Sequence, residues 1–227
     1  MQITEIYKSV QGESTYAGLP CIFVRLTGCN LRCSWCDSEY AFYGGSKMSR
    51  EEILGEVKKL SPSGGYVEIT GGEPMLQERE VVPLMQDLLK AGYKVLLETS
   101  GERVLASVPA GVIKIVDVKC PHSGAPDTFR MENLDVLQPG DEVKFVIRDR
   151  ADFEFARDFT LRHDLATRAG AVLFSPAFKK APSLERSTSN CALDPRVLVE
   201  WMLEDGVPAR LSLQIHKFIW EPQKKGV

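Results

Sequence analysis

Short β-rich segments alternate with helical segments along this sequence, and this alternation restricts the chain to very few folds. The predicted strands cover residues 3–9, 21–26, 66–70, 94–99, 113–119, 142–147, 171–174 and 210–215. Strands that alternate with helices indicate an α/β fold with a parallel sheet or barrel. Six of the strands follow the first hairpin-like pair, which is too few for a complete eight-unit barrel. We therefore expect an incomplete, TIM-like parallel β/α barrel.

The predicted helices have recognisable ends. They cover residues 50–60, 80–91, 132–138, 151–169 and 195–205. Ser49 and Glu52 form a capping box ahead of the first helix. Asp194, Pro195 and Gly206 are the residue types that begin and end a helix, and they frame the last one. Residues 179–190 are polar and poorly patterned, so we expect a loop there.

The composition limits the class of protein. The 227 residues are enough for one domain with a sizeable core, and 44% hydrophobic and 26% charged residues are ordinary for a globular chain. A net charge of −3 gives no general case for binding nucleic acid or a membrane. No apolar run could span a bilayer, and the first residues lack a secretory signal. We expect one cytoplasmic domain over residues 1–227, with a C-terminal tail from about residue 218.

Three cysteines, Cys29, Cys33 and Cys36, have the spacing C-x3-C-x2-C directly after the predicted strand 21–26. Closely spaced thiolates hold iron–sulfur clusters, normally four for a four-iron cluster, so three would leave one iron open to a small molecule. Structural zinc needs four ligands, usually as two pairs, and no second cysteine pair is present. Disulfides do not suit a long chain with few cysteines and no secretory signal. An incomplete iron–sulfur ligand set is the favoured interpretation.

Reactive side chains collect at the ends of the predicted strands. They are the three cysteines, Glu73, Thr99, Asp117, Lys119, Ser175 and His216. In α/β barrels such strand ends meet at one mouth, so we expect a single site. Arg25 lies within the apolar run 21–26, where an unpaired charge would be costly. It is therefore expected either to contact an anion or to form a salt bridge.

The cysteine spacing, with the aromatic Trp35 before the third cysteine, resembles that of the radical S-adenosylmethionine (radical SAM) enzymes. Gly71-Gly72-Glu73-Pro74 resembles the loop with which these enzymes hold the SAM amino group. The resemblance implies a 4Fe–4S cluster whose open iron chelates the amino and carboxylate groups of SAM. An electron then splits SAM into methionine and a 5′-deoxyadenosyl radical, while the protein orients the cofactor and excludes competing reactions.

Four further motifs, spread over nearly the whole chain, narrow the resemblance to the 7-carboxy-7-deazaguanine synthase family. They are Gln11-Gly12-Glu13, Cys36-Asp37-Ser38, Glu98-Thr99-Ser100-Gly101 and Gln214-Ile215-His216-Lys217. The short length fits too, because this family has a trimmed radical SAM barrel. The resemblance implies a ring-contracting lyase that converts 6-carboxy-5,6,7,8-tetrahydropterin to 7-carboxy-7-deazaguanine, the precursor of queuosine-type bases. Hydrogen abstraction from C6, ring contraction, return of hydrogen to regenerate SAM and loss of ammonia are the implied steps.

The resemblance also implies roles for individual residues, with no catalytic residue beyond the cofactors. Cys29, Cys33 and Cys36 bind the cluster, and Ser38 supplies a hydroxyl ligand to Mg²⁺ where the family often has threonine. The implied SAM contacts are Trp35, Gly72, Glu73, Ser100, Gly101, Asp117, Val118, Lys119, Ser175, Pro176, Ala177 and Phe178. The implied substrate contacts are Val10, Gln11, Gly12, Glu13, Arg25, Thr99 and His216. Without the resemblance, Ser38 would be a turn residue, Lys119 a solvated lysine, Phe178 a core residue and His216 a structural histidine.

The C-terminus departs from the family pattern. Family members often end shortly after the histidine, whereas this chain continues through Phe218-Ile219-Trp220-Glu221-Pro222 to a polar end. We expect this tail to fray in solvent. The resemblance further implies a homodimer, and the chemistry requires an electron donor such as flavodoxin or ferredoxin.

Two rival functions match part of the sequence. A glycyl-radical-enzyme activase has the same cysteine spacing but needs a surface groove for a protein partner, whereas Gln11-Gly12-Glu13 and His216 indicate an enclosed site for a small molecule. An iron–sulfur electron carrier would normally have a fourth cysteine and no use for Gly71-Gly72-Glu73-Pro74. Turnover of the carboxypterin distinguishes the first rival, and cleavage of SAM distinguishes the second.

Overall fold

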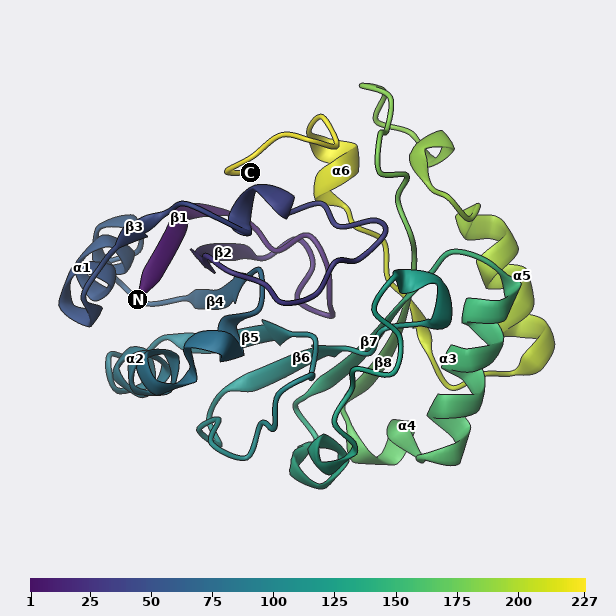
Figure 1. Cartoon of the computed structure of the whole chain (residues 1–227), viewed down its shortest axis with the longest axis horizontal. Helices are drawn as coiled ribbons and strands as arrows, with labels where there is room; N and C mark the ends of the chain where they lie inside the picture. The colour runs from purple at the N-terminus through teal and green to yellow at the C-terminus, as the bar shows by residue number, and fades with distance from the viewer.

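One curved sheet of nine strands forms the centre of the computed structural model, which describes residues 1–227 (Figure 1). The strands are β1 (Gln2–Val10), β2 (Pro20–Leu26), β3 (Ser46–Lys47), β4 (Tyr66–Gly71), β5 (Lys94–Thr99), β6 (Ile113–Asp117), β7 (Glu142–Ile147), β8 (Ala171–Pro176) and β9 (Arg210–Leu211). Their order is β3-β1-β2-β4-β5-β6-β7-β8-β9. β1 is antiparallel to β2 and β3, and all neighbouring pairs from β2 to β9 are parallel. Because β3 and β9 are unpaired edges, the barrel is incomplete, as predicted.

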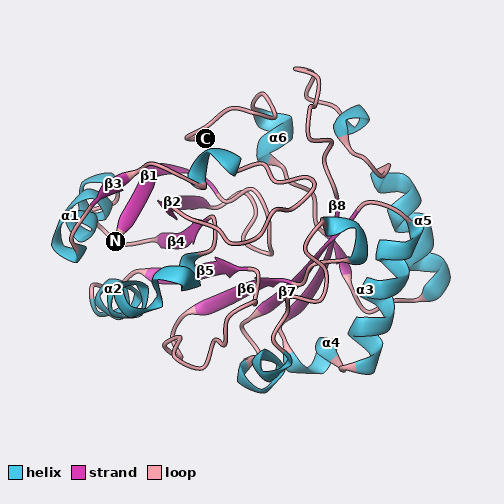
Figure 2. Ribbon diagram, in the orientation of Figure 1, coloured by secondary structure: helices cyan, strands magenta, loops and turns pink.

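Helices cover the outer face of this sheet (Figure 2). The α-helices are α1 (Arg50–Leu60), α2 (Glu78–Lys90), α3 (Arg150–Arg162), α4 (Leu165–Arg168), α5 (Pro195–Asp205) and α6 (His216–Ile219). The 3₁₀ helices are η1 (Glu39–Ala41), η2 (Pro74–Gln77), η3 (Pro121–Ser123), η4 (Met131–Val136) and η5 (Thr188–Asn190). The predicted capping box of α1 is present, with both the Ser49 and the Glu52 hydrogen bonds formed. None of the helices combines the length and hydropathy that crossing a membrane requires.

The outward-pointing side chains of the strands form two apolar layers under the helices. In the first, Val24 and Ile69 pack with side chains of α1 and α2. In the second, Phe145 and Phe174 pack with side chains of α3 and α5, and their ring centroids are 5.7 Å apart. Burying one such side chain contributes roughly 1.5–3 kcal/mol, so these layers supply most of the stabilisation of the fold.

The inward-pointing side chains of the same strands are largely polar. Parallel register places Arg25 beside Thr70 and Asp117 beside Lys144. Glu68 and Lys144 are buried although they carry ionisable groups. Because successive residues of a strand point to opposite faces, an apolar outer face and a polar inner face alternate along one strand. The inner face is therefore where the functional groups of the sheet collect.

The structure corrects the predicted helix 151–169. It contains two helices, because α3 ends at Arg162 and Asp164 has a left-handed backbone with φ 56°. Aspartate tolerates this conformation better than most residues, so the chain turns without glycine or proline. The turn returns Leu165 to the second apolar layer, where its side chain is fully buried.

The structure also corrects the C-terminal region. The predicted strand 210–215 is confined to Arg210–Leu211, and His216 begins α6 instead of closing a strand. The backbone leaves the sheet because Ile215 N donates to Gly12 O at 2.8 Å. The tail does not simply extend into solvent: Pro222 is buried, and Lys225 Nζ lies 4.3 Å from the ring centroid of Tyr40.

Candidate active site

One cavity joins the inner face of the sheet to the cysteine loop and the C-terminal segment. Its wall contains the three motif cysteines, the segment Gln11-Gly12-Glu13 and the loop Gly71-Gly72-Glu73. Arg25 and His216 also line it. Groups from opposite ends of the sequence therefore share one cavity, and most of the residues predicted to meet at one mouth line it, although Ser175 does not.

Glycine allows the cysteine loop and the Gly71-Gly72-Glu73-Pro74 loop to approach each other closely. A Cβ atom on Gly72 would lie 2.2 Å from the carbonyl oxygen of Gly28. The backbone of Glu73 donates to the same oxygen at 2.8 Å. Any larger residue at position 72 would push the two loops apart, because such a separation is far inside the van der Waals limit.

The Glu73 carboxylate fastens this loop to the end of β5. It accepts hydrogen bonds from Thr99 Oγ1 at 2.7 Å, Ser100 N at 2.8 Å and Ser100 Oγ at 2.6 Å. It also accepts one from Met75 N at 3.0 Å, at the start of η2. The carboxylate is buried and fully engaged within the protein, so it holds the shape of the loop.

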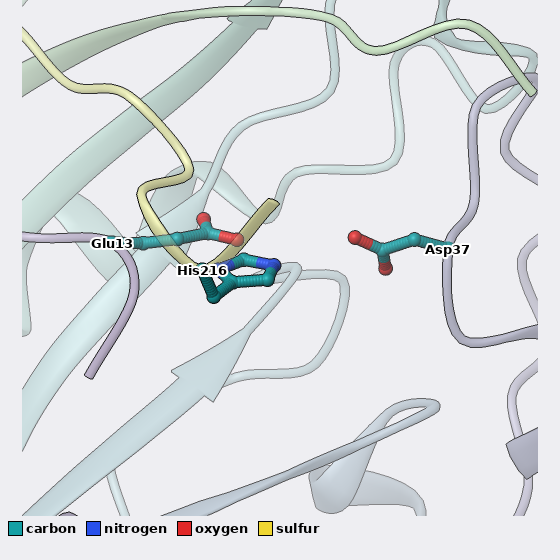
Figure 3. Close-up of side chains that lie close together, drawn as sticks. All are labelled: Glu13, Asp37 and His216. Carbon is teal, nitrogen blue, oxygen red and sulfur yellow. The ribbon is translucent and has the colours of Figure 1, made fainter. Parts of the chain in front are cut away.

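The segment Gln11-Gly12-Glu13 is held from both sides. The side-chain amide of Gln11 donates to Glu68 Oε2 at 2.6 Å, and its oxygen accepts a hydrogen bond from the backbone of Glu13. A Cβ on Gly12 would lie 2.0 Å from Nδ1 of His216, so only glycine lets the imidazole pack on this backbone. Glu13, Asp37 and His216 consequently lie together in the cavity (Figure 3).

The Glu13 carboxylate and the Lys144 ammonium form a buried ion pair at the floor of the cavity. Lys144 Nζ lies 2.6 Å from Glu13 Oε2 and 2.5 Å from Glu98 Oε1. Burial raises the pKa of Glu13, but Lys144 and His216 outweigh this effect and hold it at about 2. Burial and the nearby Glu98 raise the pKa of Glu68 to about 8. The cavity therefore contains an ionised and a neutral carboxyl group at neutral pH.

Arg25 makes the salt bridge that was one of its two predicted roles. Its Nε donates to Glu5 Oε1 at 2.8 Å, and its Nη2 donates to Tyr7 Oη at 3.1 Å. Tyr40 donates to the same Glu5 oxygen at 2.7 Å. A guanidinium has five N–H donors, so Arg25 retains donors for an anion in the cavity that it lines.

Comparisons with known proteins agree with this site. Residues 23–118 match the model of the Radical SAM superfamily. A 7-carboxy-7-deazaguanine synthase from Koribacter versatilis is 65% identical over 227 residues, which cover 100% of both chains. This chain belongs to the 7-carboxy-7-deazaguanine synthase family. A synthase of the same name from Chlorobaculum tepidum is 38% identical over 100% of this chain and 97% of its own.

Solved structures show the same fold at low sequence identity. QueE from Escherichia coli has a TM-score of 0.69 at 23% identity, covering 93% of this chain and 92% of that chain. SuiB from Streptococcus suis bound to its precursor peptide has a TM-score of 0.61 at 10% identity, covering 84% of this chain and 47% of that one. The 7-carboxy-7-deazaguanine synthase family uses the radical SAM fold, with a 4Fe–4S cluster, SAM, a reductant and a small-molecule substrate.

The three cysteines fit a cluster better than a single metal ion. All three are free thiols at the wall of the same cavity. Ligand sulfurs around one tetrahedral zinc lie about 3.8 Å apart, since each Zn–S bond is about 2.3 Å. The three sulfurs here do not all lie within 4.8 Å of one another, and no His, Asp or Glu completes such a group with them. The three sulfurs therefore lie too far apart to bind one zinc ion together.

Most of the predicted site residues line the cavity. They are Cys29, Cys33, Cys36 and Ser38 for metals, Trp35, Gly72, Glu73, Ser100, Asp117 and Lys119 for SAM, and Val10, Gln11, Gly12, Glu13, Arg25, Thr99 and His216 for substrate. Asp117 Oδ2 pairs with Lys119 Nζ at 2.9 Å, while Asp117 Oδ1 is buried without a hydrogen-bond partner. Asp117 Oδ1 therefore remains available to accept a hydrogen bond from a ligand.

The remaining predicted SAM contacts lie outside the cavity wall, and SAM binding by them stays a prediction. They are Gly101, Val118, Ser175, Pro176, Ala177 and Phe178. Phe178 instead packs against Phe218, with ring centroids 5.7 Å apart, and beneath the ammonium of Lys217.

Sequence reasoning missed Glu68 and Lys144, which line the cavity. The available signal was the one used for Arg25, a charged residue inside an apolar strand.

Proposed function

We propose that this chain converts 6-carboxy-5,6,7,8-tetrahydropterin to 7-carboxy-7-deazaguanine with release of ammonia. The proposal rests on the cavity that places the three cysteine thiols together with Glu13, Arg25 and His216. The reaction needs no external oxidant, because the product and one ammonia together contain all the atoms of the substrate. Membership of the synthase family supports the same conclusion.

The cysteine loop would hold the cluster, and the neighbouring strand ends would hold SAM. Cys29, Cys33 and Cys36 would be the three protein ligands, which leaves one iron for SAM. When bound, these two cofactors supply reductive cleavage of SAM and abstraction of a hydrogen atom from the substrate. The Gly72 backbone lies against the cysteine loop, so this loop would hold the SAM amino group next to the cluster ligands.

The substrate would be bound by Glu13, Arg25 and His216, which line the same cavity. The ionised Glu13 accepts hydrogen bonds from the amino and ring N–H groups of the pterin, which are donors. The free N–H groups of Arg25 bind the carboxylate through a charge-assisted contact. His216 packs on the backbone of Gly12 and borders the same space, and burial lowers the pKa of its imidazole, so it is neutral near pH 7. A neutral imidazole can donate and accept one hydrogen bond each.

Ser38 is the proposed Mg²⁺ ligand. It lines the cavity two residues after the third cysteine, and its Oγ lies 3.8 Å from Cys36 Sγ. One hydroxyl is a weak site by itself, so the ion would also need the substrate carboxylate and waters. Ser38 and Arg25 line the same cavity, so under this proposal the ion and the guanidinium would share the substrate carboxylate.

The test is anaerobic incubation of the reconstituted enzyme with SAM, a strong reductant, Mg²⁺ and the carboxypterin, followed by mass analysis. We expect stoichiometric 7-carboxy-7-deazaguanine and ammonia, with SAM conserved over many turnovers. Cleavage of SAM without carboxypterin turnover would favour the glycyl-radical-enzyme activase. Formation of neither 7-carboxy-7-deazaguanine nor 5′-deoxyadenosine would favour an electron carrier.

Three finer expectations from the sequence remain predictions. They are a homodimer, an electron donor of the flavodoxin or ferredoxin type, and a cytoplasmic location. The first is checked by sedimentation of the reconstituted protein, and the second by replacing the chemical reductant with each purified carrier in the same assay.

A further inference from the structure

Lys144 is a buried charge of the cavity that none of the sequence motifs includes. It lies on the inner face of β7, and only 4% of its side chain is exposed. Its ammonium contacts Glu13 and Glu98 directly and lies 3.9 Å from Asp117 Oδ2. These three carboxylates belong to the segment after β1, to β5 and to β6. One ammonium group therefore links three segments that line the cavity.

The two oxygens of Glu13 are both engaged, and the residue lines the cavity. Oε2 accepts from Lys144, and Oε1 accepts from Gln214 Nε2 at 2.7 Å. Each carboxylate oxygen has two lone pairs, so the group retains acceptor capacity after both bonds. The remaining titratable neighbours of Glu13 are His216 and Asp37, on α6 and the cysteine loop (Figure 3).

We propose that Lys144 is a positioning residue that keeps Glu13 an ionised, acceptor-only group, and that this makes the site select a heterocycle presenting N–H donors to Glu13. The inference rests on the proposed function, since it concerns how the aminopyrimidinone edge of the carboxypterin is recognised. A carboxylate repels a carbonyl oxygen, whereas a protonated carboxyl group would donate a hydrogen bond to it. Lys144 therefore sets a preference for a 2-amino over a 2-oxo ring.

A second buried lysine shows what a purely structural ion pair looks like in this fold. Lys114, on the neighbouring strand β6, points to the outer face and pairs with Asp141 at 2.7 Å. Both side chains are buried, and neither lines the cavity. Lys114 is thus a matched control, because its loss should affect folding without affecting ligand recognition.

The experiment measures ligand binding by calorimetry to the reconstituted enzyme with SAM, without reductant, so that no substrate is consumed. The ligands are the carboxypterin and its lumazine analogue, in which an oxygen replaces the 2-amino group. For the unmodified enzyme we expect the dissociation constant of the lumazine analogue to be about 100 times that of the carboxypterin. This ratio is the preference for the pterin. In Lys144→Met the pterin dissociation constant should rise about 10- to 100-fold, and the preference should fall about tenfold. Lys144→Arg should restore most of the preference, and Lys114→Met should leave it unchanged while lowering the melting temperature.

An unchanged preference in Lys144→Met would overturn the inference. An equal loss of affinity for both ligands is such a result, and it would mean that the lysine only supports the shape of the cavity. Lys144→Gln keeps a hydrogen-bond donor but removes the charge, so it gives the same test if the methionine variant does not fold. Failure of the unmodified enzyme to bind the carboxypterin would contradict the proposed function instead.

Discussion

The two faces of the sheet carry different side chains: those of the outer face are mainly apolar, and those of the inner face are largely polar. On the outer face Val24 and Ile69 are fully buried among apolar side chains of α1 and α2. One residue further along or back, Arg25 and Glu68 point inward and make ion pairs and hydrogen bonds at the cavity. Alternation of side chains lets one strand supply both environments. Replacing an apolar side chain of the outer face should therefore change stability, whereas replacing a ligand-facing group such as Glu13 or a motif cysteine should change binding or chemistry.

The largest effect is expected at the rim of the inner face. Cys33→Ala removes one of three cluster ligands, so SAM cleavage should fall at least 10⁴-fold, or about 5.4 kcal/mol of activation free energy. Iron content and 5′-deoxyadenosine formation after reduction measure the loss. Cys21→Ala is the control, because this buried thiol lies on β2 away from the cavity wall. Cleavage retained by Cys33→Ala would contradict the cluster assignment.

The opposite result is expected on the outer face. Phe145→Ala leaves a cavity among Phe155, Phe159 and Phe174, whose ring centroids lie 5.7–6.4 Å from that of Phe145. The free energy of unfolding should fall by about 3–5 kcal/mol. The affinity of the remaining folded protein for the carboxypterin should stay within twofold. Urea denaturation and calorimetry measure the two quantities, and a large loss of affinity would show that the two faces are not independent.

Two glutamates that line the cavity should differ in how strongly they affect carboxypterin binding. Glu13 is ionised, so Glu13→Gln should weaken carboxypterin binding about 10- to 100-fold while SAM binding changes little. Glu68 is held neutral at pH 7, so Glu68→Gln replaces it with a group of similar polarity and should change the same affinity less than threefold. Equal losses of substrate and SAM affinity in Glu13→Gln would mean that Glu13 does not bind the pterin directly.

Glu68 also makes a testable contribution to pH-dependent stability. Its pKa is raised in the folded state, so the unfolded chain releases this proton at lower pH than the folded chain does. Glu68 therefore lowers the free energy of unfolding increasingly as pH rises from about 4.5 to about 8. The stability of Glu68→Gln relative to the unmodified chain should consequently increase across that range. Urea denaturation of both proteins at a series of pH values measures the difference, and a constant difference would mean that Glu68 is ionised throughout.

Helices and strands could be predicted where the segment itself contains capping residues or an apolar pattern. Helix α5 spans 195–205 as predicted, because Asp194 caps it and Gly206 ends it in a left-handed conformation. The strands from β2 to β8 were predicted because their outer faces are apolar. The break between α3 and α4 was missed, since the turn at Asp164 depends on Leu165 reaching the second apolar layer.

The candidate site could be predicted where residues form contiguous motifs. The cysteine triplet and Gln11-Gly12-Glu13 are of this kind, and both line the cavity. Lys144 could not be connected with Glu13 from the sequence, because 131 residues separate them and only the sheet order brings them together. The path of the C-terminal segment was missed for the same reason: it is set by the hydrogen bond from Ile215 N to Gly12 O.

A smaller effect is expected at Ser38, on the rim of the cavity. Ser38→Ala should abolish the stimulation by Mg²⁺ and reduce turnover severalfold, while the cluster absorbance is retained. Ser38→Thr keeps the hydroxyl group and should keep the stimulation. An unchanged dependence of the rate on Mg²⁺ in Ser38→Ala would exclude the hydroxyl as a ligand.

The smallest effect is expected at the end of α3, outside the cavity. Asp164 has φ 56°, and Asp164→Gly should relieve this left-handed conformation and raise the free energy of unfolding by about 0.5–1 kcal/mol. Gly206 directly follows α5 and has a similar left-handed φ of 58°, and a Cβ atom there would meet no other atom within 4 Å. Gly206→Ala should therefore lower stability by about 1 kcal/mol for conformational reasons alone. If Asp164→Gly instead destabilised the protein, the aspartate side chain would have to stabilise the turn, and the break between α3 and α4 would have a local cause that the sequence could have revealed.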